Sequence, residues 1–480
     1  MDVTQTKNIE ISTELQQLIT GEQARRYRIL PKSEQDGTLT FFIDSKQPVD
    51  ELANELEILF GKTVDLISIA SESITEGVSK YYRNTKSGAT TKKIDLRNAS
   101  SDDFLEDLIL EAKQFGSSDI HIEAYEERCR VRIRIDGDLV ERYVINREDY
   151  PSLINKIKIK SNLDIAEKRL PQDGRIFFEQ RGVKFDIRVS ILPTLHGEKV
   201  VMRLLNSDAT EIDIHSLGFS EEELKSYLEG IKKPNGIILI SGPTGSGKTT
   251  TLYATLKLLN EEKRNVVTVE DPIEYTLEGI NQVQVKDSIG LTFASALKSF
   301  LRQDPDVIML GEIRDAETAN MAIRAALTGH LVLSTIHTNS AWRTISRLVD
   351  MGVEPFLLAS TINTTAAQRL VKVLCAECKE EKVLSKEDYP PHFIPEKQLT
   401  HHNVAKGCEA CFFTGYKGRK AIYEIIPIDN SLSKAIKNNN FDISDELKEM
   451  GLRTLSQNAF DSFAQGITSL DEVYPLLSSD

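Results

Sequence analysis

The segment "GPTGSGKT" (residues 242–249) constrains the fold most, because it matches the phosphate-loop pattern G-x-x-x-x-G-K-[ST] at every fixed position. Glycines in such a loop let backbone N–H groups surround phosphates, and the N-terminus of the following helix adds positive partial charge. We expect Lys248 to contact the β- and γ-phosphates of ATP and Thr249 to bind Mg²⁺. The residues predicted to bind the nucleotide here are Gly242, Thr244, Gly245, Ser246, Gly247, Lys248, Thr249 and Thr250.

Short apolar runs alternate with helical segments on both sides of this loop. The predicted strands are 235–242, 265–270, 306–312 and 330–337, and residues 248–262 are predicted to be a helix. This alternation is typical of a parallel α/β sheet. We therefore expect residues 208–371 to form an α/β core, with the phosphate loop between a strand and a helix.

Acidic side chains follow two of the predicted strands. They are Glu270, Asp271 and Glu274 in "VEDPIEY" (269–275) and Glu312 in "DVIMLGEIRD" (306–315). Nucleotide hydrolysis needs a carboxylate at such a strand end, where it holds Mg²⁺ or orients water. In a typical Walker B strand, an aspartate that helps to hold Mg²⁺ stands at the position of Gly311. We therefore expect Glu312 to take a role related to that of this aspartate. We predict the three glutamates to be catalytic and Asp271 to bind the nucleotide, and the spacing leaves open which glutamate polarises water.

His337 follows a further apolar strand and precedes Thr338 and Asn339. A single histidine is usually structural. However, the C-terminal ends of parallel strands are where ligands bind in α/β sheets. The position therefore favours a catalytic role for His337, as a sensor of the γ-phosphate.

Four of the five cysteines form two C-x-x-C pairs. These are Cys375 with Cys378 and Cys408 with Cys411. Four thiolates in this layout are typical of a tetrahedral zinc site, although the intervening 379–407 exceeds the spacing of about 15–20 residues in short zinc modules. A redox pair would favour one C-x-x-C at the start of a helix. We predict a closed, structural Zn²⁺ site, and we expect the lone Cys129 to be packed in a core.

Composition argues against a nucleic-acid-binding, a membrane-inserted and a secreted protein. The chain has 480 residues and a formal net charge of −14, which argues against a duplex-binding surface. It has no apolar run of 18 or more residues, so we expect no direct membrane insertion. Its first residues, "MDVTQTKNIE", lack the pattern of a secretory signal. We expect a cytoplasmic protein that does not bind nucleic acid.

The segments before the core predict two further domains. Within residues 1–84, "TLTFFIDS" (38–45) has a strand pattern and "PVDELANELEILFG" (48–61) has a helix pattern. The polar, Gly- and Thr-containing residues 85–96 are predicted to be a linker. Residues 97–207 are predicted to be α+β, with a hairpin at Asp136-Gly137. After the core we expect a tetracysteine zinc subdomain (372–421) and a helical subdomain (422–480).

Four segments together resemble the motifs of one family. They are "SGPTGSGKTTTLYATL", "VTVEDPIEY", "LRQDPDVIMLGEIRDAETA" and "ALTGHLVLSTIHTNSA". In this order they are similar to the Walker A, Asp box, Walker B and His box of the secretion ATPases, in the type II secretion and type IV pilus assembly branch. In this family the Gly-Glu ending of Walker B is normal. The resemblance covers about residues 97–470.

The resemblance implies a RecA-like ATPase core, a PAS-like α+β mid-domain, a small N-terminal α/β partner-binding domain and a tetracysteine zinc subdomain. It also implies a cytoplasmic homohexamer that works on inner-membrane platform and cytoplasmic-domain proteins, and is peripheral to the inner membrane through them. ATP would bind between mid-domain and core, and hydrolysis would move the two as rigid bodies.

Arginines of the mid-domain approach the phosphates in this family when the domain closes. Such an arginine offsets developing charge and links closure to chemistry. By the resemblance, Arg175 and Arg188 are candidates for this catalytic role, and Arg203 is a weaker one. For three other strand arginines, Arg130, Arg132 and Arg134, we expect a solvated or ion-paired face.

The leading interpretation is therefore an ATPase that powers pseudopilus assembly and export by a type II secretion system. A type IV pilus extension ATPase is the alternative. The short region before the linker favours secretion. The intact predicted catalytic residues argue against a binding module that uses ATP only to assemble. The net charge of −14 argues against a nucleic-acid translocase.

Overall fold

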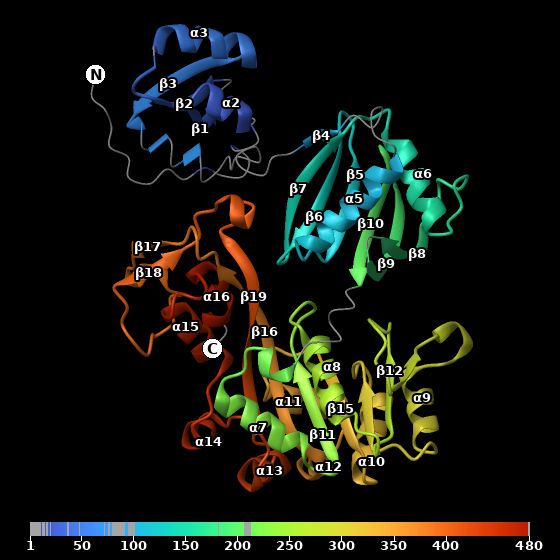
Figure 1. Ribbon diagram of the computed structural model, residues 1–480. Coiled ribbons are helices and arrows are strands. Elements are labelled where there is room, and N and C mark those ends of the chain that lie inside the picture. Colours follow the sequence, from blue (N-terminus) through green and yellow to red (C-terminus); the bar gives the residue numbers. More distant parts are fainter. Residues whose placement is uncertain are drawn as a thin grey trace. The chain divides into compact units, whose positions relative to one another are not determined.

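A computed structural model describes residues 11, 15, 18–19, 21–35, 38–47, 49–71, 73–74, 77–78, 92–94, 101–180, 182–205 and 213–478 (Figure 1). The chain divides into two compact units, residues 1–90 and 91–480. Most of the predicted linker 85–96 lies outside the described residues. Its described part, β4 (Lys92–Ile94), is a strand that pairs parallel with a strand of the second unit. Among the described residues, no helix has the length and apolar character needed to cross a membrane.

The first unit is a small α/β sheet with the strand order β1-β2-β3. Its elements are α2 (Gly21–Arg26), β1 (Ile29–Gln35), β2 (Thr38–Asp44), α3 (Val49–Phe60) and β3 (Thr63–Ile69). β2 and β3 are parallel, so α3 is the crossover between them. Leu52 and Leu56 of α3 are buried in the same cluster as Phe41 and Ile43 of β2. The predicted strand at 38–45 and helix at 48–61 are confirmed over their described residues.

The second unit begins with an α+β lobe, the mid-domain. Its sheet order is β4-β7-β6-β5-β10-β9-β8. Its other elements are α5 (Ser101–Gln114), β5 (Asp119–Ala124), β6 (Cys129–Ile135), β7 (Asp138–Ile145), α6 (Tyr150–Lys160), β8 (Gln172–Gln180), β9 (Val183–Thr194) and β10 (Gly197–Leu205). The predicted hairpin is present: Asp136 and Gly137 have φ of 50° and 97°, as a two-residue hairpin turn requires. One sheet face packs on α5 and α6, and the other carries charged side chains.

The core sheet of the second unit has the order β13-β12-β14-β15-β11-β16-β19. Its strands are β11 (Gly236–Ser241), β12 (Val266–Glu270), β13 (Asn281–Gln284), β14 (Val307–Leu310), β15 (Leu331–Ile336), β16 (Ile362–Leu374) and β19 (Tyr416–Pro427). The parallel α/β sheet predicted for residues 208–371 is confirmed, because β11 to β16 pair parallel throughout. Strand β19, which comes later in the chain, adds an antiparallel edge next to β16. The chain between these two strands leaves and returns at the same end, so no crossover helix is needed.

Helices cover both faces of this sheet. They are η2 (Ile214–Ser216), α7 (Glu221–Ile231), α8 (Lys248–Leu259), η3 (Asp287–Ile289), α9 (Phe293–Phe300), α10 (Ala316–Leu327), α11 (Arg343–Asp350) and α12 (Pro355–Thr361). Strand β11 is buried along its whole length, which explains its uninterrupted apolar sequence.

The C-terminal part of the chain shares the core's hydrophobic cluster. Its elements are β17 (Glu380–Val383), η4 (Lys386–Asp388), β18 (His401–Val404), η5 (Glu409–Cys411), α13 (Asn430–Lys437), α14 (Ser444–Glu449), α15 (Leu455–Ala464) and α16 (Leu470–Leu477). Phe460 and Leu432 belong to the same buried cluster as Leu358 of α12. The predicted domain borders at 371 and 421 fall inside β16 and β19, so the cysteine region is an extension of this strand pair.

Candidate functional site

The phosphate loop lies between the end of β11 and the start of α8, as the motif predicts. Gly245 and Gly247 have φ of 82° and 87°, in the left-handed region that favours glycine. A Cβ on Gly247 would lie 2.8 Å from Nε2 of Gln368. A Cβ there would need a backbone conformation that other residues rarely adopt and would press on the Gln368 side chain, which accounts for glycine at this position.

Lys248 and Ser246 supply the polar side chains of the loop. Lys248 is 8% exposed, and its Nζ donates hydrogen bonds to the carbonyl oxygens of Gly242 (2.8 Å) and Pro243 (2.9 Å). Burial lowers the pKa of Lys248, while the Glu312 carboxylate acts in the opposite direction. The buried Ser246 Oγ has no hydrogen-bond partner among the described residues. A buried hydroxyl without a partner and a cation in a glycine loop fit the oxygens of a phosphate.

One cavity of about 510 Å³ collects nearly all of the predicted nucleotide and catalytic residues of the core. Those that line it are Thr244, Gly245, Ser246, Gly247, Lys248, Thr249, Thr250, Glu270, Asp271, Glu274, Glu312 and His337. Gly242 contacts Lys248 but does not line the cavity. The carboxylates and His337 come from the ends of β12, β14 and β15, which are neighbours in the sheet.

The two candidate glutamates at the ends of β12 and β14 differ in their surroundings. Glu270 is 3% exposed and accepts hydrogen bonds from Thr268 (2.6 Å), Gln282 (3.1 Å) and the Tyr253 hydroxyl. Both oxygens of the Glu270 carboxylate are thus occupied by donors. Glu312 instead has Oε2 3.4 Å from Nε2 of His337. Glu312 therefore has an oxygen beside a group that can exchange protons.

Arg314 is a cavity residue that the sequence reasoning missed. Its guanidinium forms an ion pair with Glu312 and lies 3.6 Å from Oδ2 of Asp271, so it links the acidic groups of two strands. The hydrogen bond to Glu312 raises the pKa of Arg314. The available signal was a cation two positions after the glutamate in "GEIRD". Arg419 and Leu370, on the other side of the loop, also line the cavity and were missed.

The mid-domain arginines lie outside this cavity. Arg188 donates to the carbonyl oxygen of Ile273 and to Glu274 (3.4 Å), so it contacts the segment that carries the acids. Arg175 and Arg203 are its cross-strand neighbours on β8 and β10. Arg175 lines a separate pocket that also includes Ile273 and Glu274. Arg203 forms an ion pair with Asp119 at 3.1 Å.

The ion-paired face that we predicted for three other arginines is confirmed. Arg130 and Arg132 both contact Glu123, at 3.0 and 2.8 Å, and Arg134 lies 3.6 Å from Asp119. Cys129 is 1% exposed within the mid-domain core, as expected.

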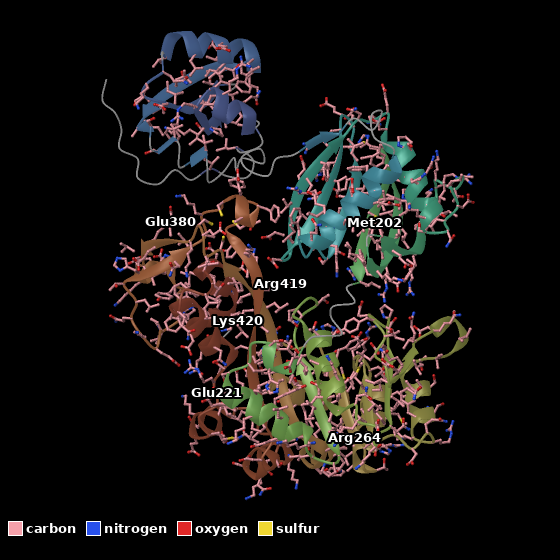
Figure 2. All side chains as sticks on the ribbon, in the orientation of Figure 1. Met202, Glu221, Arg264, Glu380, Arg419 and Lys420 are labelled. Carbon is pink, nitrogen blue, oxygen red and sulfur yellow. The ribbon has the colours of Figure 1, made fainter. Side chains whose placement is uncertain are left out.

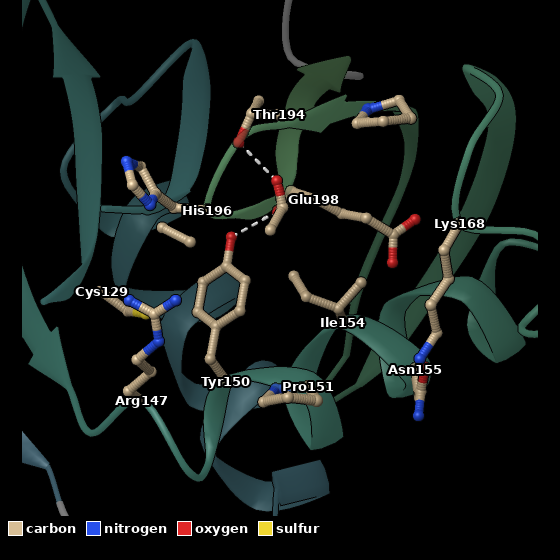
Figure 3. Close-up of a pocket in the computed structure, with 13 residues that line it drawn as sticks. Cys129, Arg147, Tyr150, Pro151, Ile154, Asn155, Lys168, Thr194, His196 and Glu198 are labelled. Atoms are coloured by element: carbon tan, nitrogen blue, oxygen red, sulfur yellow. Dashed lines mark hydrogen bonds between the residues drawn. The ribbon is translucent and has the colours of Figure 1, made fainter. Parts of the chain in front are cut away.

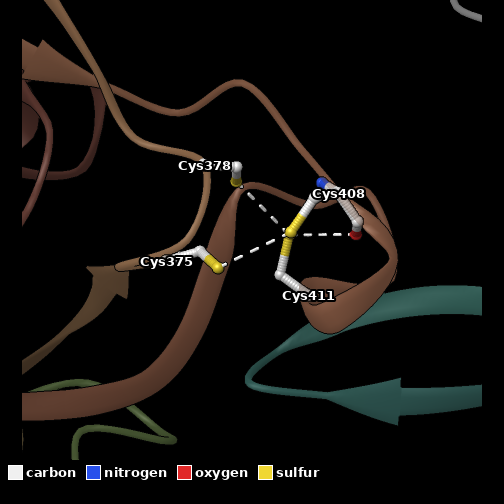
Figure 4. A group of neighbouring side chains, drawn as sticks. All are labelled: Cys375, Cys378, Cys408 and Cys411. Carbon is white, nitrogen blue, oxygen red and sulfur yellow. Dashed lines mark hydrogen bonds between the residues drawn. The ribbon is translucent and has the colours of Figure 1, made fainter.

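The four predicted zinc ligands form one cluster at the end of the β16–β19 pair (Figure 4). All four Sγ atoms lie within 4.8 Å of one another, and neighbouring pairs are 3.7–3.9 Å apart. A tetrahedral site with Zn–S bonds of about 2.3 Å places its sulfurs about 3.8 Å apart. The backbone N–H groups of Cys408 and Gly415 donate to Sγ of Cys411. The donor set and its spacing fit a closed zinc site.

A second cavity, of about 330 Å³, lies in the mid-domain (Figure 3). Tyr150 crosses it and donates a hydrogen bond to the carbonyl oxygen of Glu198 at 2.6 Å. Arg147, Lys168 and His196 also line it. None of the predicted catalytic or nucleotide-binding residues is among its lining residues.

The fold and the cavity define a P-loop nucleoside triphosphatase with a RecA-like core. The model of the type II/IV secretion system protein family matches residues 97–475, and the chain belongs to this family, whose members are ATPases. The model of the MshEN domain matches residues 3–88, which include the described parts of the first unit.

Similar proteins come from both secretion and pilus systems. The type II secretion system ATPase E of Vibrio cholerae is 47% identical over 76% of this chain and 72% of its own length. The type II secretion system protein E of Pseudomonas aeruginosa is 42% identical over 89% and 90%. The type IV pilus assembly ATPase PilB of Myxococcus xanthus is 39% identical over 97% and 87%.

Two solved structures support the fold. The Legionella pneumophila ATPase DotB has a TM-score of 0.62 and 22% identity, and the match covers 81% of this chain and all of DotB. The pilus retraction motor PilT, solved with bound ADP, has a TM-score of 0.54 and 27% identity, with 78% and 97% covered.

Proposed function

We propose that this ATPase powers pseudopilus assembly and protein export by a type II secretion system. One observation carries the proposal: the phosphate loop, the acidic residues and His337 line a single cavity. The 47% identity to a type II secretion system ATPase supports the choice of system. A type IV pilus extension ATPase is the second candidate, because the pilus assembly relative from Myxococcus aligns over 97% of the chain.

In the proposed reaction, Lys248 and the loop N–H groups hold the β- and γ-phosphates. Mg²⁺, held by Thr249 with help from nearby carboxylates, would neutralise charge on these phosphates. We assign activation of the attacking water to Glu312. Its Oε1 pairs with Arg314 and its Oε2 lies 3.4 Å from Nε2 of His337, whereas both Glu270 oxygens already accept hydrogen bonds. Glu270 then orients Tyr253 and the strand end, and His337 reports the γ-phosphate to Glu312.

Arg188 is the proposed connection between hydrolysis and movement. Its guanidinium contacts Ile273 and Glu274 next to the cavity. Exchange of the Glu274 carboxylate for phosphate oxygens would carry the mid-domain toward the nucleotide and offset charge in the transition state. Arg175, its neighbour across β8 and β9, adds positive charge to the same face.

The four cysteines would hold Zn²⁺ in a structural role, because a site with four protein ligands leaves no position for a substrate. We further propose that the ATPase is a homohexamer. In this proposal it is cytoplasmic and reaches the inner membrane through platform and cytoplasmic-domain proteins of the machine. The partner surface belongs to the first unit.

The test is replacement of the chromosomal gene by the Glu312→Gln variant. If the proposal holds, exported proteins accumulate inside the cell, while surface pili are unaffected. Loss of pili with normal export would favour the pilus alternative, and normal export with normal pili would overturn both. Glu317→Gln is the matched control, since Glu317 is an exposed residue of α10 paired with Lys298.

A further inference from the structure

The turn between β6 and β7 contacts the β16–β19 strand pair within the second unit. Asp136, the first residue of this turn, accepts a hydrogen bond from the backbone N–H of Gly418 at 2.6 Å. Its other carboxylate oxygen lies 3.7 Å from Nε of Arg419. Arg419, labelled in Figure 2, is also a lining residue of the nucleotide cavity. One arginine thus touches both the cavity and a mid-domain carboxylate.

The sheet order shows which end of the nucleotide Arg419 faces. The loop follows β11, with β15, β14 and β12 on one side of that strand and β16 and β19 on the other. Glu312 and His337 stand on the first side, so the γ-phosphate points there. The opposite end of the nucleotide then points toward β16 and β19. Leu370 and Arg419 line that side of the cavity.

We propose that Arg419 binds the nucleoside end of the nucleotide, at the ribose and α-phosphate, and that Asp136 competes with the nucleotide for its guanidinium. This inference rests on the nucleotide site of the proposed function. Arg419 contributes to binding ADP and ATP alike, because both share the nucleoside end. Because Asp136 belongs to the mid-domain, the contribution of Arg419 to nucleotide affinity depends on where the mid-domain lies.

Neighbouring contacts join the mid-domain to the strand pair and to the cysteine region. Lys372 of β16 forms an ion pair with Asp138 at 2.8 Å and also contacts Glu472 at 3.1 Å. The rings of Phe115 and Phe412 pack edge to face, with centroids 4.7 Å apart. These contacts do not involve Arg419. A substitution of Asp138 therefore weakens the same interface but leaves the ion pair of Arg419 intact, and it serves as the control.

The test is ADP binding to the full chain, measured by titration calorimetry in four variants. Arg419→Ala should weaken ADP binding about tenfold, as expected for a lost charge-assisted hydrogen bond. Asp136→Asn should tighten it about threefold, the value of a partly exposed ion pair. The double variant should bind like Arg419→Ala, because Asp136 acts only through Arg419. Asp138→Asn should bind like the wild type.

Three results would overturn the inference. They are unchanged ADP affinity in Arg419→Ala, equal effects of Asp136→Asn and Asp138→Asn, and a full Asp136→Asn effect in the double variant. Each can occur while the wild type binds ADP and Lys248→Ala does not, which leaves the proposed function standing. If the wild type itself fails to bind ADP, the nucleotide site is wrong and the inference falls with it.

Discussion

At the residue scale, the proposed phosphate site depends most on the charge of the buried Lys248 ammonium. Burial holds its pKa below the ordinary lysine value of 10.5, with Glu312 acting against this shift. Phosphate contact requires the charged form. The free protein therefore loses this proton at a lower pH than an exposed lysine would, and nucleotide binding at alkaline pH must take up a proton.

We predict that ADP affinity falls as the pH rises toward 10.5, starting below the range in which an ordinary lysine titrates. The measurement is ADP titration across this pH range, with proton uptake obtained from buffers of different ionisation enthalpy. Lys248→Met should bind weakly without this pH dependence. An ADP affinity of the wild type that stays constant up to that pH would refute the assignment.

Part of the site could be predicted from residue order alone. The loop motif and the strand-end position predicted Lys248, Thr249 and Glu312 as site residues, and all three line the cavity. Arg314 and Arg419 could not be found in this way. Their roles depend on which carboxylates lie beside them, and Asp271 and Asp136 come from distant segments.

At the element scale, the charged face of the mid-domain sheet is built around Glu123 of β5. Arg130, Arg132 and Lys199 surround its carboxylate, which is 5% exposed. Burial alone would raise the pKa of Glu123, but hydrogen bonds from Arg132 and Arg130 outweigh it and lower the pKa to about 2. This group contributes stability above its unfolded pKa of 4.5, and the contribution is lost as the pH falls toward 2.

We predict that Glu123→Gln lowers the free energy of unfolding by roughly 2 kcal/mol or more near neutral pH, because it leaves partly buried cations without their carboxylate. The deficit should shrink as the pH falls from 4.5 toward 2. Urea unfolding at several pH values measures it. Glu179→Gln, which breaks an exposed pair with Lys184, should cost less than about 1 kcal/mol. Equal effects of both variants would contradict the account.

The cysteine cluster gives a second prediction at this scale. Purified protein should contain about one zinc per chain, and Cys378→Ser should lose it because a ligand is missing. Elemental analysis measures the metal directly. Cys129→Ala is the matched control: this buried cysteine lies outside the cluster, so its removal should leave the zinc content unchanged. A wild type with four titratable thiols and no metal would exclude the zinc site.

The strand pair that supports this cluster was not visible in the sequence. β16 reads "INTTAAQRLVKVL", in which polar residues interrupt any apolar run or alternation. Two of these polar side chains, Asn363 and Gln368, are buried and form hydrogen bonds with the distant residues Asn235 and Thr251. The mainly apolar strands β11 and β15 were predicted because burial on both faces favours apolar residues along their length.

At the scale of the whole molecule, Arg188 joins the mid-domain to the acidic segment of the core. We predict that Arg188→Ala lowers kcat about 100-fold while ADP affinity stays the same, because in the proposed reaction this arginine acts on the γ-phosphate and on closure. Steady-state hydrolysis and ADP titration separate the two effects. Arg128→Ala, in an exposed mid-domain pair with Glu141, should leave both unchanged. An unchanged kcat in Arg188→Ala would refute its role.

The central claim is that this cavity hydrolyses ATP with Glu312 activating the water, and phosphate release by Glu312→Gln tests it most directly. The variant keeps the loop and Lys248, so it should bind ATP with the affinity of the wild type. Its rate of phosphate release at saturating ATP should fall about 100-fold or more, the typical contribution of a general base. Release at the wild-type rate, with ATP bound in the same cavity, would contradict the account.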